Sequence, residues 1–250
     1  MRRSGSRPRG SCGGAPRLAI RSRSYDAEVT TTSFSLRDLW PMYDLRLTTG
    51  NLVLRYPTEA ELPAFAEIVE AGIHAPDEMP FGLAWTDVAA ERRNVDSYQW
   101  WMGSRGRWSP ASWSLTMGVW EDGRPVGFQD LRGEEFPVYR TVSSGSWLGR
   151  EFQGRGIGRL MRQAVLALAF DHLGAAVAET EAFLDNPASN RVSLAIGYEP
   201  NGFGRLAPRG AARETQRFRL TAEGWRARPR PEVSVEGLEA ALPLFGLPSS

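Results

Sequence analysis

The chain has 250 residues, of which 42% are hydrophobic and 24% charged, which is enough apolar material for a substantial core. A single cysteine, Cys12, excludes a disulfide framework and a multi-cysteine metal site, and the two histidines, His74 and His172, leave little for a histidine-rich metal centre or a Ser-His-Asp triad. No run approaches the roughly 18 apolar residues of a membrane-spanning helix, so we expect neither a membrane span nor a bound metal.

Charge is unevenly distributed along the chain. Residues 1–37 hold eight arginines against Asp26 and Glu28, a formal charge of +6 in a chain whose net charge is +1, so the remainder is mildly acidic. A segment so rich in Arg, Ser and Gly cannot bury enough apolar surface to offset its chain entropy, and we predict a disordered extension over residues 1–37. No hydrophobic stretch of signal-peptide length follows Arg2-Arg3, so we expect a cytoplasmic protein. The acidic remainder disfavours nucleic acid as a partner.

The next part of the chain is predicted to begin with two strands and two helices. Thr58 and Glu61 have the spacing of a capping box, and apolar residues then recur at helical spacing until Gly72 ends the helix. Ser109-Pro110 is typical of an N-cap followed by a proline in the first helical turn. The predicted elements are strands over residues 45–48 and 51–56, a helix ending at Gly72, an irregular loop over 74–86 and a helix over 87–102.

A β-hairpin around Asp122-Gly123 is the clearest strand signal, because Asp-Gly favours the tight turn between antiparallel strands. Further apolar runs continue the meander, and strand and helix patterns alternate after it. This order predicts an α+β domain with one mixed, mostly antiparallel sheet. The predicted strands cover residues 115–120, 126–131, 142–148, 177–183, 198–206 and 215–220, and the helices cover 156–173 and 187–196.

The most informative segment is a glycine-rich turn that leads into the predicted helix from residue 156. It reads Gln153-Gly154-Arg155-Gly156-Ile157-Gly158, so the backbone amides are bare and can converge on an anion at the positive end of the helix. Arg155 and Arg159 add positive charge. The pattern fits a phosphate cradle or a plain strand-to-helix connection. A Walker loop needs a lysine, which this chain lacks, and a Rossmann fingerprint belongs to a parallel sheet.

Two motifs in the same order resemble those of the GNAT acyltransferases. Gln153–Gly158 is similar to the acyl-CoA pyrophosphate motif of that family, and Asp185–Val192 followed by Gly197-Tyr198 is similar to its second motif. The likeness covers roughly residues 44–225 and is closest to the branch of the ribosomal-protein alanine acetyltransferases. Within that branch, the segments around Trp40, His74–Phe81 and Ser144–Gly149 resemble an actinobacterial subgroup with at least one member that binds succinyl-CoA.

The resemblance implies a GNAT fold over residues 38–228, with helices on both faces of a sheet that is splayed at the acyl-CoA site. In this arrangement acyl-CoA, as co-substrate, contacts the backbone of one diverging strand, and Asn186 holds the pantetheine arm from the other side. Ser189 is the candidate catalytic residue, which would protonate or hydrogen-bond the departing thiolate. Helix capping is the alternative for Asn186 and Ser189. The residues expected to bind acyl-CoA are Trp147, Leu148, Gln153, Gly154, Arg155, Gly156, Ile157, Gly158, Asn186 and Ser189.

The sequence indicates fewer definite residues for the acceptor side of the site than for the acyl-CoA side. The candidate substrate residues are Gln129, Ser146 and His74. Six tryptophans either roof the acceptor or pack in the core or at a subunit interface: Trp85, Trp100, Trp101, Trp108, Trp113 and Trp120. The general base is left open among Asp130, Glu134, Glu135, His74 and Asp77.

These features together predict an acyl-CoA-dependent N-acyltransferase. It would move acetyl or, following the subgroup likeness, succinyl to a small-molecule or protein amine by direct attack in a ternary complex. A catalytically silent acyl-CoA-binding module, acting as a sensor or assembly partner, stays open because no base is obvious. Residues 229–250 follow an Arg-Pro-Arg-Pro linker and are apolar enough to dock on the domain or on a neighbouring subunit, and we expect a homo-oligomer.

Overall fold

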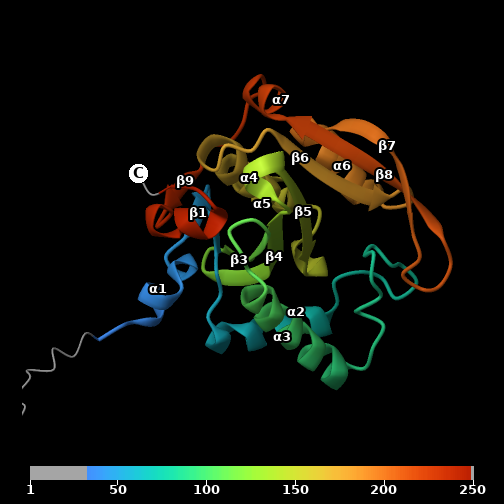
Figure 1. The fold of residues 1–250 in the computed structure, drawn as a ribbon. Helices are drawn as coiled ribbons and strands as arrows, with labels where there is room; N and C mark the ends of the chain where they lie inside the picture. Colours follow the sequence, from blue (N-terminus) through green and yellow to red (C-terminus); the bar gives the residue numbers. More distant parts are fainter. Residues whose placement is uncertain (1–32, 249–250) are drawn as a thin grey trace, which may run out of the picture. The chain divides into compact units, whose positions relative to one another are not determined.

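One nine-stranded sheet organises the chain, with the strand order β7-β8-β6-β5-β4-β3-β2-β1-β9. The computed structural model describes residues 33–248, which form one structural unit from Phe34 onward (Figure 1). The strands are β1 (Arg46–Thr49), β2 (Leu52–Arg55), β3 (Trp113–Glu121), β4 (Arg124–Gly133), β5 (Thr141–Leu148), β6 (Val177–Phe183), β7 (Glu199–Leu206), β8 (Arg213–Thr221) and β9 (Ser234–Glu236).

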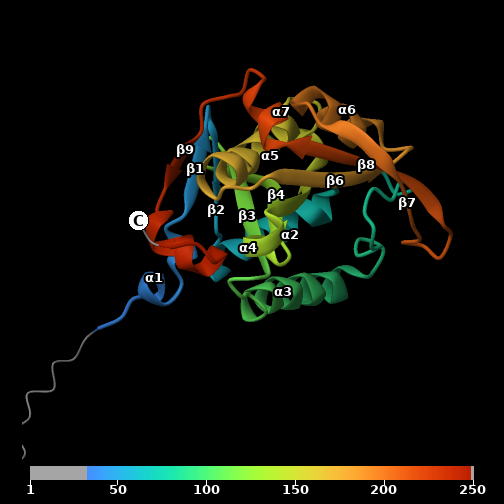
Figure 2. The ribbon, with the colours of Figure 1, turned by 45° about the horizontal axis from the view of Figure 1, so that its top comes forward.

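Helices lie on both faces of this sheet. On one face α5 contacts β1, β2, β4 and β5 and packs beside α6, while α2 and α3 cover β4 and β3 on the other face (Figure 2). The helices are α1 (Leu36–Leu39), α2 (Leu62–Ala71), α3 (Ala90–Gly106), α4 (Phe136–Tyr139), α5 (Ile157–Ala167), α6 (Pro187–Ile196) and α7 (Ala222–Arg226). The expected α+β class and the mixed, mostly antiparallel sheet with helices on both faces are confirmed.

The sheet opens between β5 and β6, its one parallel pair. Their pairing is confined to Thr141–Ser143 against Val177–Glu179, although β5 continues to Leu148 and β6 to Phe183. Beyond Ser143 the two strands therefore diverge, which leaves part of the backbone of each without a neighbouring strand. This splayed gap is the feature of the fold that positions the candidate site.

Local sequence signals account for most element boundaries. Thr58 and Glu61 form the predicted capping box, and Asp122 and Gly123 have the positive φ angles, 48° and 81°, of a tight hairpin turn. Two expectations are wrong in position. The second helix begins at Ala90 rather than at residue 87, and Ser109-Pro110 starts no helix because Ser109 and Ser112 instead exchange backbone hydrogen bonds in a turn.

The two ends of the described chain are held in different ways: the first helix is capped by a side chain, and the C-terminal segment packs against the domain. Most of the predicted extension over residues 1–37 lies outside the described residues, but its last part enters α1, where Ser35 caps the helix. At the other end β9 pairs with β1, and Phe245 is fully buried against Trp108 and Trp113. The Trp108 indole N–H also donates to the Leu244 carbonyl at 2.6 Å. The C-terminal segment thus packs on its own domain.

Candidate functional site

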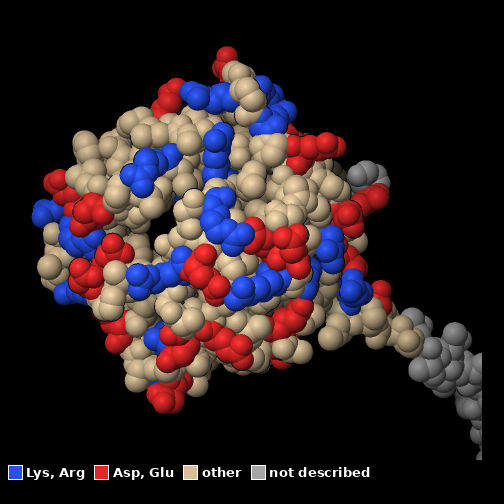
Figure 3. Space-filling view, turned by 180° about the vertical axis from the view of Figure 1, so that it is seen from behind, with Lys and Arg blue, Asp and Glu red and all other residues tan. Residues whose placement is uncertain are grey.

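A cavity of about 2320 Å³ occupies the splayed gap and the space beneath residues 74–89, which belong to the connection between α2 and α3 and are called the 74–89 loop. Seen from behind, the surface is hollowed, with basic side chains close to the hollow (Figure 3). A pocket for a single small ligand usually has roughly 300–1,000 Å³, so this cavity has room for two substrates together. Its walls come from β5, β6, the start of α5, α6 and the 74–89 loop.

The glycine-rich turn presents bare amides to one end of this cavity. Gly154 and Gly156 have φ angles of +73° and +85°, and a Cβ atom at either position would meet nothing within 4 Å. In the described chain, the amide N–H groups of residues 154–158 donate to no backbone carbonyl, because the helical bonds begin with Arg159. Successive amides that point into open space at a helix N-terminus form an anion-binding nest.

The side chains around this nest divide into those that face it and those that do not. Arg159 is exposed and lines the cavity, whereas Arg155 turns away and pairs with Glu121 at 2.9 Å. Ile157 is buried in the core, so only its amide belongs to the nest. Gln153 fastens the turn, since its Nε2 donates to the carbonyls of Ile73 at 2.8 Å and Leu148 at 2.9 Å. The nest is therefore rigidly attached to both α2 and β5.

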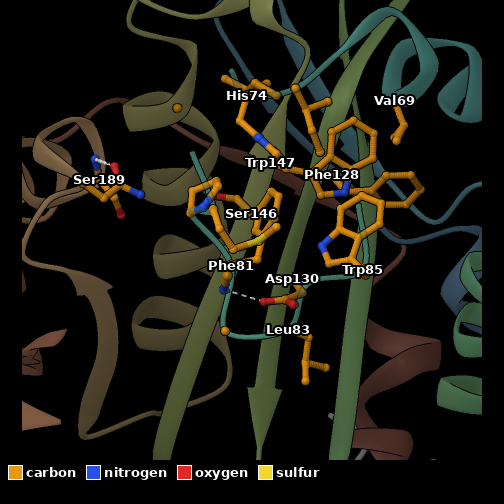
Figure 4. Close-up of a pocket in the computed structure, with 18 of the residues that line it drawn as sticks. Val69, His74, Phe81, Leu83, Trp85, Phe128, Asp130, Ser146, Trp147 and Ser189 are labelled. Carbon is orange, nitrogen blue, oxygen red and sulfur yellow. Dashed lines mark hydrogen bonds between the residues drawn. The ribbon is translucent and has the colours of Figure 1, made fainter. Parts of the chain in front are cut away.

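Asn186 and Ser189 form the opposite wall at the start of α6. The Asn186 side-chain oxygen accepts the Ser189 N–H at 3.1 Å, so the capping role left open by the sequence is present. The Ser189 hydroxyl lines the cavity and makes no hydrogen bond within residues 33–248. Figure 4 shows Ser189 across the cavity from Ser146 and Trp147. Capping by Asn186 and an available Ser189 hydroxyl coexist.

Aromatic rings line the part of the cavity below the 74–89 loop. Trp147 lies 5.5 Å from Phe128 and 6.4 Å from Trp85, measured between ring centroids, and Phe81 lies 5.3 Å from Trp85 (Figure 4). The tryptophans expected as a roof divide into two groups. Trp85, Trp100 and Trp101 line the cavity, while Trp108, Trp113 and Trp120 do not and pack against other aromatic rings.

His74 is held by hydrogen bonds at both ring nitrogens. Nδ1 lies 2.7 Å from the Ala75 carbonyl oxygen, and Nε2 lies 2.8 Å from the Thr86 hydroxyl. A carbonyl only accepts, so Nδ1 carries the proton and the Nε2 lone pair of the neutral ring accepts from Thr86. This arrangement suits the His74 ring to holding the loop.

Asp130 and Gln129 on β4 both bind the backbone of Gly145 on β5. The Asp130 carboxylate accepts from the Gly145 N–H and the Arg132 guanidinium, and burial raises the pKa of Asp130 against the opposing pull of Arg132. Gln129 is fully buried, and its Nε2 donates to the Gly145 and Asp130 carbonyls, both at 2.9 Å. Asp130 lines the cavity, but Gln129 does not, contrary to its expected place beside the substrate.

The remaining base candidates are distributed unevenly. Asp77 lines the cavity, whereas Glu134 and Glu135 follow β4 outside it. Ser146, Trp147 and Leu148 line it from β5. Within residues 33–248 no cluster of His, Cys, Asp and Glu could hold a metal ion, and no helix there is long and apolar enough to cross a membrane.

Two arginines close the open side of the cavity from the β7–β8 hairpin. Arg209 forms a two-pronged pair with Asp87 at 2.7 and 2.8 Å and reaches carbonyls of the 74–89 loop. Arg213 donates to the Met79 carbonyl at 2.8 Å and pairs with Asp185 at 2.6 Å. The loop that carries Phe81 and Trp85 is thus tied to a strand pair far away in sequence.

One polar cluster at the cavity has no place in the sequence analysis. Arg162 of α5 is only 5% exposed yet lines the cavity, and its Nη1 donates to the Ser193 hydroxyl at 2.9 Å. Tyr198 is buried beside it. The only sequence signal is an arginine in the mostly apolar stretch Met161–Ala167, where Gln163 is the other polar residue. Helical periodicity alone does not distinguish this arginine from a solvent-facing residue.

Comparisons with known proteins agree with this geometry. The family model described as "Acetyltransferase (GNAT) domain" matches residues 51–199. RimJ of Mycobacterium smegmatis, solved with CoA-disulfide, is 19% identical, with a TM-score of 0.61 over 77% of this chain and 98% of that chain. RimL, a ribosomal L7/L12 alpha-N-protein acetyltransferase solved with coenzyme A, is 17% identical, with a TM-score of 0.55 over 70% and 97% of the two chains.

A third solved structure is functionally different. MccE, a microcin C7 self-immunity acetyltransferase solved with acetyl-CoA and AMP, is 16% identical, with a TM-score of 0.52 over 68% of this chain and 92% of that chain. At these identities the likeness to the solved structures shows a shared fold.

Proposed function

The chain belongs to the GNAT acetyltransferase family, and we propose that it transfers an acyl group, succinyl in preference to acetyl, from CoA to an amine. The observation that carries the proposal is the nest of amides over residues 154–158 at the edge of a cavity large enough for two substrates. The pyrophosphate of CoA suits this nest, because its charge is met by the helix N-terminus and by Arg159.

The splayed gap supports a position for the rest of the thioester. Beyond Ser143 the backbone of β5 has no β6 partner, so the pantetheine amides can bond to it as an added strand does. Trp147 and Leu148 supply this backbone, and Asn186 and Ser189 face it from α6. In this placement the thioester sulfur lies between β5 and Ser189.

The reaction is written as direct attack of the amine on the thioester. The acceptor ammonium first loses a proton, and its nitrogen then forms a C–N bond to the acyl carbon. The C–S bond breaks and sulfur takes the electron pair. The nitrogen gives up its second proton to water as the amide forms, and the thiolate takes up a proton or a hydrogen bond from the Ser189 hydroxyl, which regains any donated proton from water. Such acid catalysis contributes about 10²–10⁴-fold, and holding both reactants in one cavity supplies the rest by positioning.

Asp130 suits the role of proton acceptor better than the other candidates. It lines the cavity, and burial raises its pKa toward the range in which a carboxylate is an effective base. Glu134 and Glu135 lie outside the cavity, and His74 and Asp77 line it from the loop, whereas Asp130 lies on β4, next to the strand proposed to hold the thioester. We include Asp130 in the proposed mechanism as the base.

The succinyl preference rests on the subgroup likeness and on polar groups in the gap. Ser144 and Ser146 line it from β5, and Thr180 lines it from β6. A pocket for acetyl alone needs only a small apolar surface. We further propose a soluble, cytoplasmic homo-oligomer that acts on a small-molecule amine or a protein N-terminus.

A catalytically silent acyl-CoA-binding module is the second candidate. The observation that favours it is that both oxygens of Asp130 already accept hydrogen bonds, from Gly145 and from Arg132. Such a protein would bind the same thioesters and release no CoA.

The two candidates are separated by release of free CoA. The purified full chain is examined by native mass spectrometry for a retained thioester and for its oligomeric state. It is then mixed with succinyl-CoA and a panel of primary amines and peptides, and thiol release is followed; Cys12 adds at most one equivalent of background. Amine-dependent turnover supports the enzyme, binding without turnover supports the silent module, and failure to bind any acyl-CoA refutes both.

A further inference from the structure

A buried cluster of polar groups lies at the closed end of the splayed gap. Arg162 of α5, Ser144 of β5 and Thr180 of β6 all line the cavity there. The Thr180 hydroxyl donates to the Ser144 carbonyl at 3.3 Å, one residue beyond the last paired residues of the two strands. The cluster therefore marks the point where the gap ends.

Arg162 carries a charge that the protein itself does not neutralise. Its Nη1 donates to Ser193, its Nε has no acceptor, and within residues 33–248 it belongs to no ion pair. The nearby Asp130 is already paired with Arg132. Burial lowers the pKa of Arg162, whereas Tyr198 and Asp130 act to raise it. A guanidinium nevertheless stays protonated at neutral pH. A buried cation with one hydroxyl partner lacks a counter-charge.

Two neutral O–H donors accompany this guanidinium. The hydroxyls of Ser144 and Tyr198 are buried and have no hydrogen-bond partner; Ser144 lines the cavity, whereas Tyr198 lies behind the lining residues. Burial raises the pKa of Tyr198 to about 12, although the charge of Arg162 acts to lower it, so the phenol keeps its proton at neutral pH. The Ser144 hydroxyl lies close to the phenol without reaching hydrogen-bond geometry. A guanidinium and two hydroxyl donors that lack acceptors match the lone pairs of a carboxylate.

The position along α5 separates this cluster from the phosphate nest. Arg162 follows Gly156 by six residues, which corresponds to about 9 Å along a helix that rises 1.5 Å per residue. Arg159 lies between them and faces the nest end of the cavity. Arg162 therefore lies farther along α5 from the nest than Arg159 does, toward the end of the gap where β5 and β6 begin to pair.

We propose that Arg162, together with Ser144 and Tyr198, binds the terminal carboxylate of the acyl group, so that the donor is the CoA thioester of a dicarboxylic acid. This inference rests on the proposed function, because it requires the thioester in the splayed gap. It goes further in assigning the selectivity to Arg162 of α5, with Ser144 and Tyr198 beside it.

The test compares three thioesters on the full chain by calorimetry: succinyl-CoA, acetyl-CoA and butyryl-CoA. Butyryl-CoA has the chain length of succinyl-CoA but no terminal carboxylate, so it controls for size. Wild type should bind succinyl-CoA about 10- to 100-fold more tightly than butyryl-CoA, as expected for charge-assisted hydrogen bonds. Arg162→Met should remove this ratio while changing affinity for acetyl-CoA less than about threefold.

Two further variants keep the test decisive. Arg159→Met, on the same helix but at the nest, should weaken all three thioesters equally. Tyr198→Phe should lose part of the succinyl preference even if Arg162→Met fails to fold. Removal of an uncompensated buried charge should leave the thermal stability of Arg162→Met unchanged or raise it.

Three results overturn the inference: a wild type that binds succinyl-CoA and butyryl-CoA equally, a ratio that survives in Arg162→Met, or, if that variant does not fold, a ratio unaffected in Tyr198→Phe. Each differs from failure of the proposed function, in which no acyl-CoA binds or no amine releases CoA. An enzyme that turns over acetyl-CoA with no succinyl preference would leave the reaction class intact and refute the carboxylate site together with the proposed succinyl preference.

Discussion

Replacing Gly156 with aspartate is expected to abolish CoA binding while the domain stays folded. A Cβ at this position meets nothing within 4 Å, so the new carboxylate enters the open space that the amides of residues 154–158 surround. It would accept their hydrogen bonds and repel phosphate. A charge-assisted hydrogen bond contributes about 1.5–3 kcal/mol, so losing two of them costs about 3–6 kcal/mol of binding free energy, or roughly 10²- to 10⁴-fold in Kd.

Gly202 provides a matched control for the backbone strain. Both Gly156 and Gly202 have a φ of +85° and open space at the Cβ position, but Gly202 lies in the β7 bulge and does not line the cavity. A side chain in this left-handed conformation costs roughly 1–2 kcal/mol of folding stability, and the cost should be equal in Gly156→Asp and Gly202→Asp.

Calorimetry with CoA and urea unfolding of both variants measure the two effects separately. We expect equal losses of stability and a loss of CoA affinity in Gly156→Asp only. Unchanged affinity in Gly156→Asp would refute the assignment of the nest, and equal losses of affinity in both variants would show that strain, rather than the site, controls binding.

Three further outcomes are expected. Ser189→Ala should lower kcat by about 10²- to 10⁴-fold and change Kd for acyl-CoA less than threefold, since the cap on α6 uses the Asn186 side chain and the Ser189 backbone. Equal kcat in both proteins would leave Ser189 without a catalytic role. Arg55 and Thr58 lower the pKa of Glu61 to about 2, so this carboxylate stabilises the fold above pH 4.5 and loses its effect as pH falls toward 2. Glu61→Gln should therefore cost about 1–2 kcal/mol in urea unfolding at pH 7, after allowance for partial exposure, and nothing near pH 2; a pH-independent difference would contradict the pKa shift. Phe245→Ala should cost about 3–5 kcal/mol because its ring is fully buried, and a loss below about 1 kcal/mol would show that the C-terminal segment does not contribute to the core.

The parts of the site that the sequence predicts are those whose signals are local. Positive φ angles in a glycine-rich turn and the Asn186 cap on α6 depend on a few neighbouring residues, so spacing alone indicates them. The expectation for Gln129 fails for a physical reason. Adjacent strand residues face opposite sides of a sheet, and the sequence does not fix which of Gln129 and Asp130 faces the cavity.

Arg162 illustrates the other limit of sequence reasoning. Its partner Ser193 lies 31 positions away on α6, and its unpaired N–H groups become visible only when the surroundings are complete. Helical periodicity reports which positions repeat and carries no information about whether a charge finds a counter-charge in three dimensions. The same holds for His74, whose hydrogen bonds to the Ala75 carbonyl and the Thr86 hydroxyl no sequence pattern indicates.

Two side chains of β4 hold β5 in place where the sheet opens. Asp130 binds the Gly145 N–H and Gln129 binds the Gly145 carbonyl, two residues beyond the last residue of β5 that pairs with β6. These bonds hold β5 to β4 where it leaves β6, so the gap is fixed before any ligand arrives, which lowers the cost of ordering on binding. Asp130 therefore has a positioning role that is independent of proton transfer. The two are separable, because an asparagine oxygen can still accept from Gly145 but cannot take a proton from an ammonium. A variant Asp130→Asn that binds acyl-CoA normally and has lost turnover would identify Asp130 as the base, whereas weakened binding with unchanged kcat would assign it to the shape of the gap.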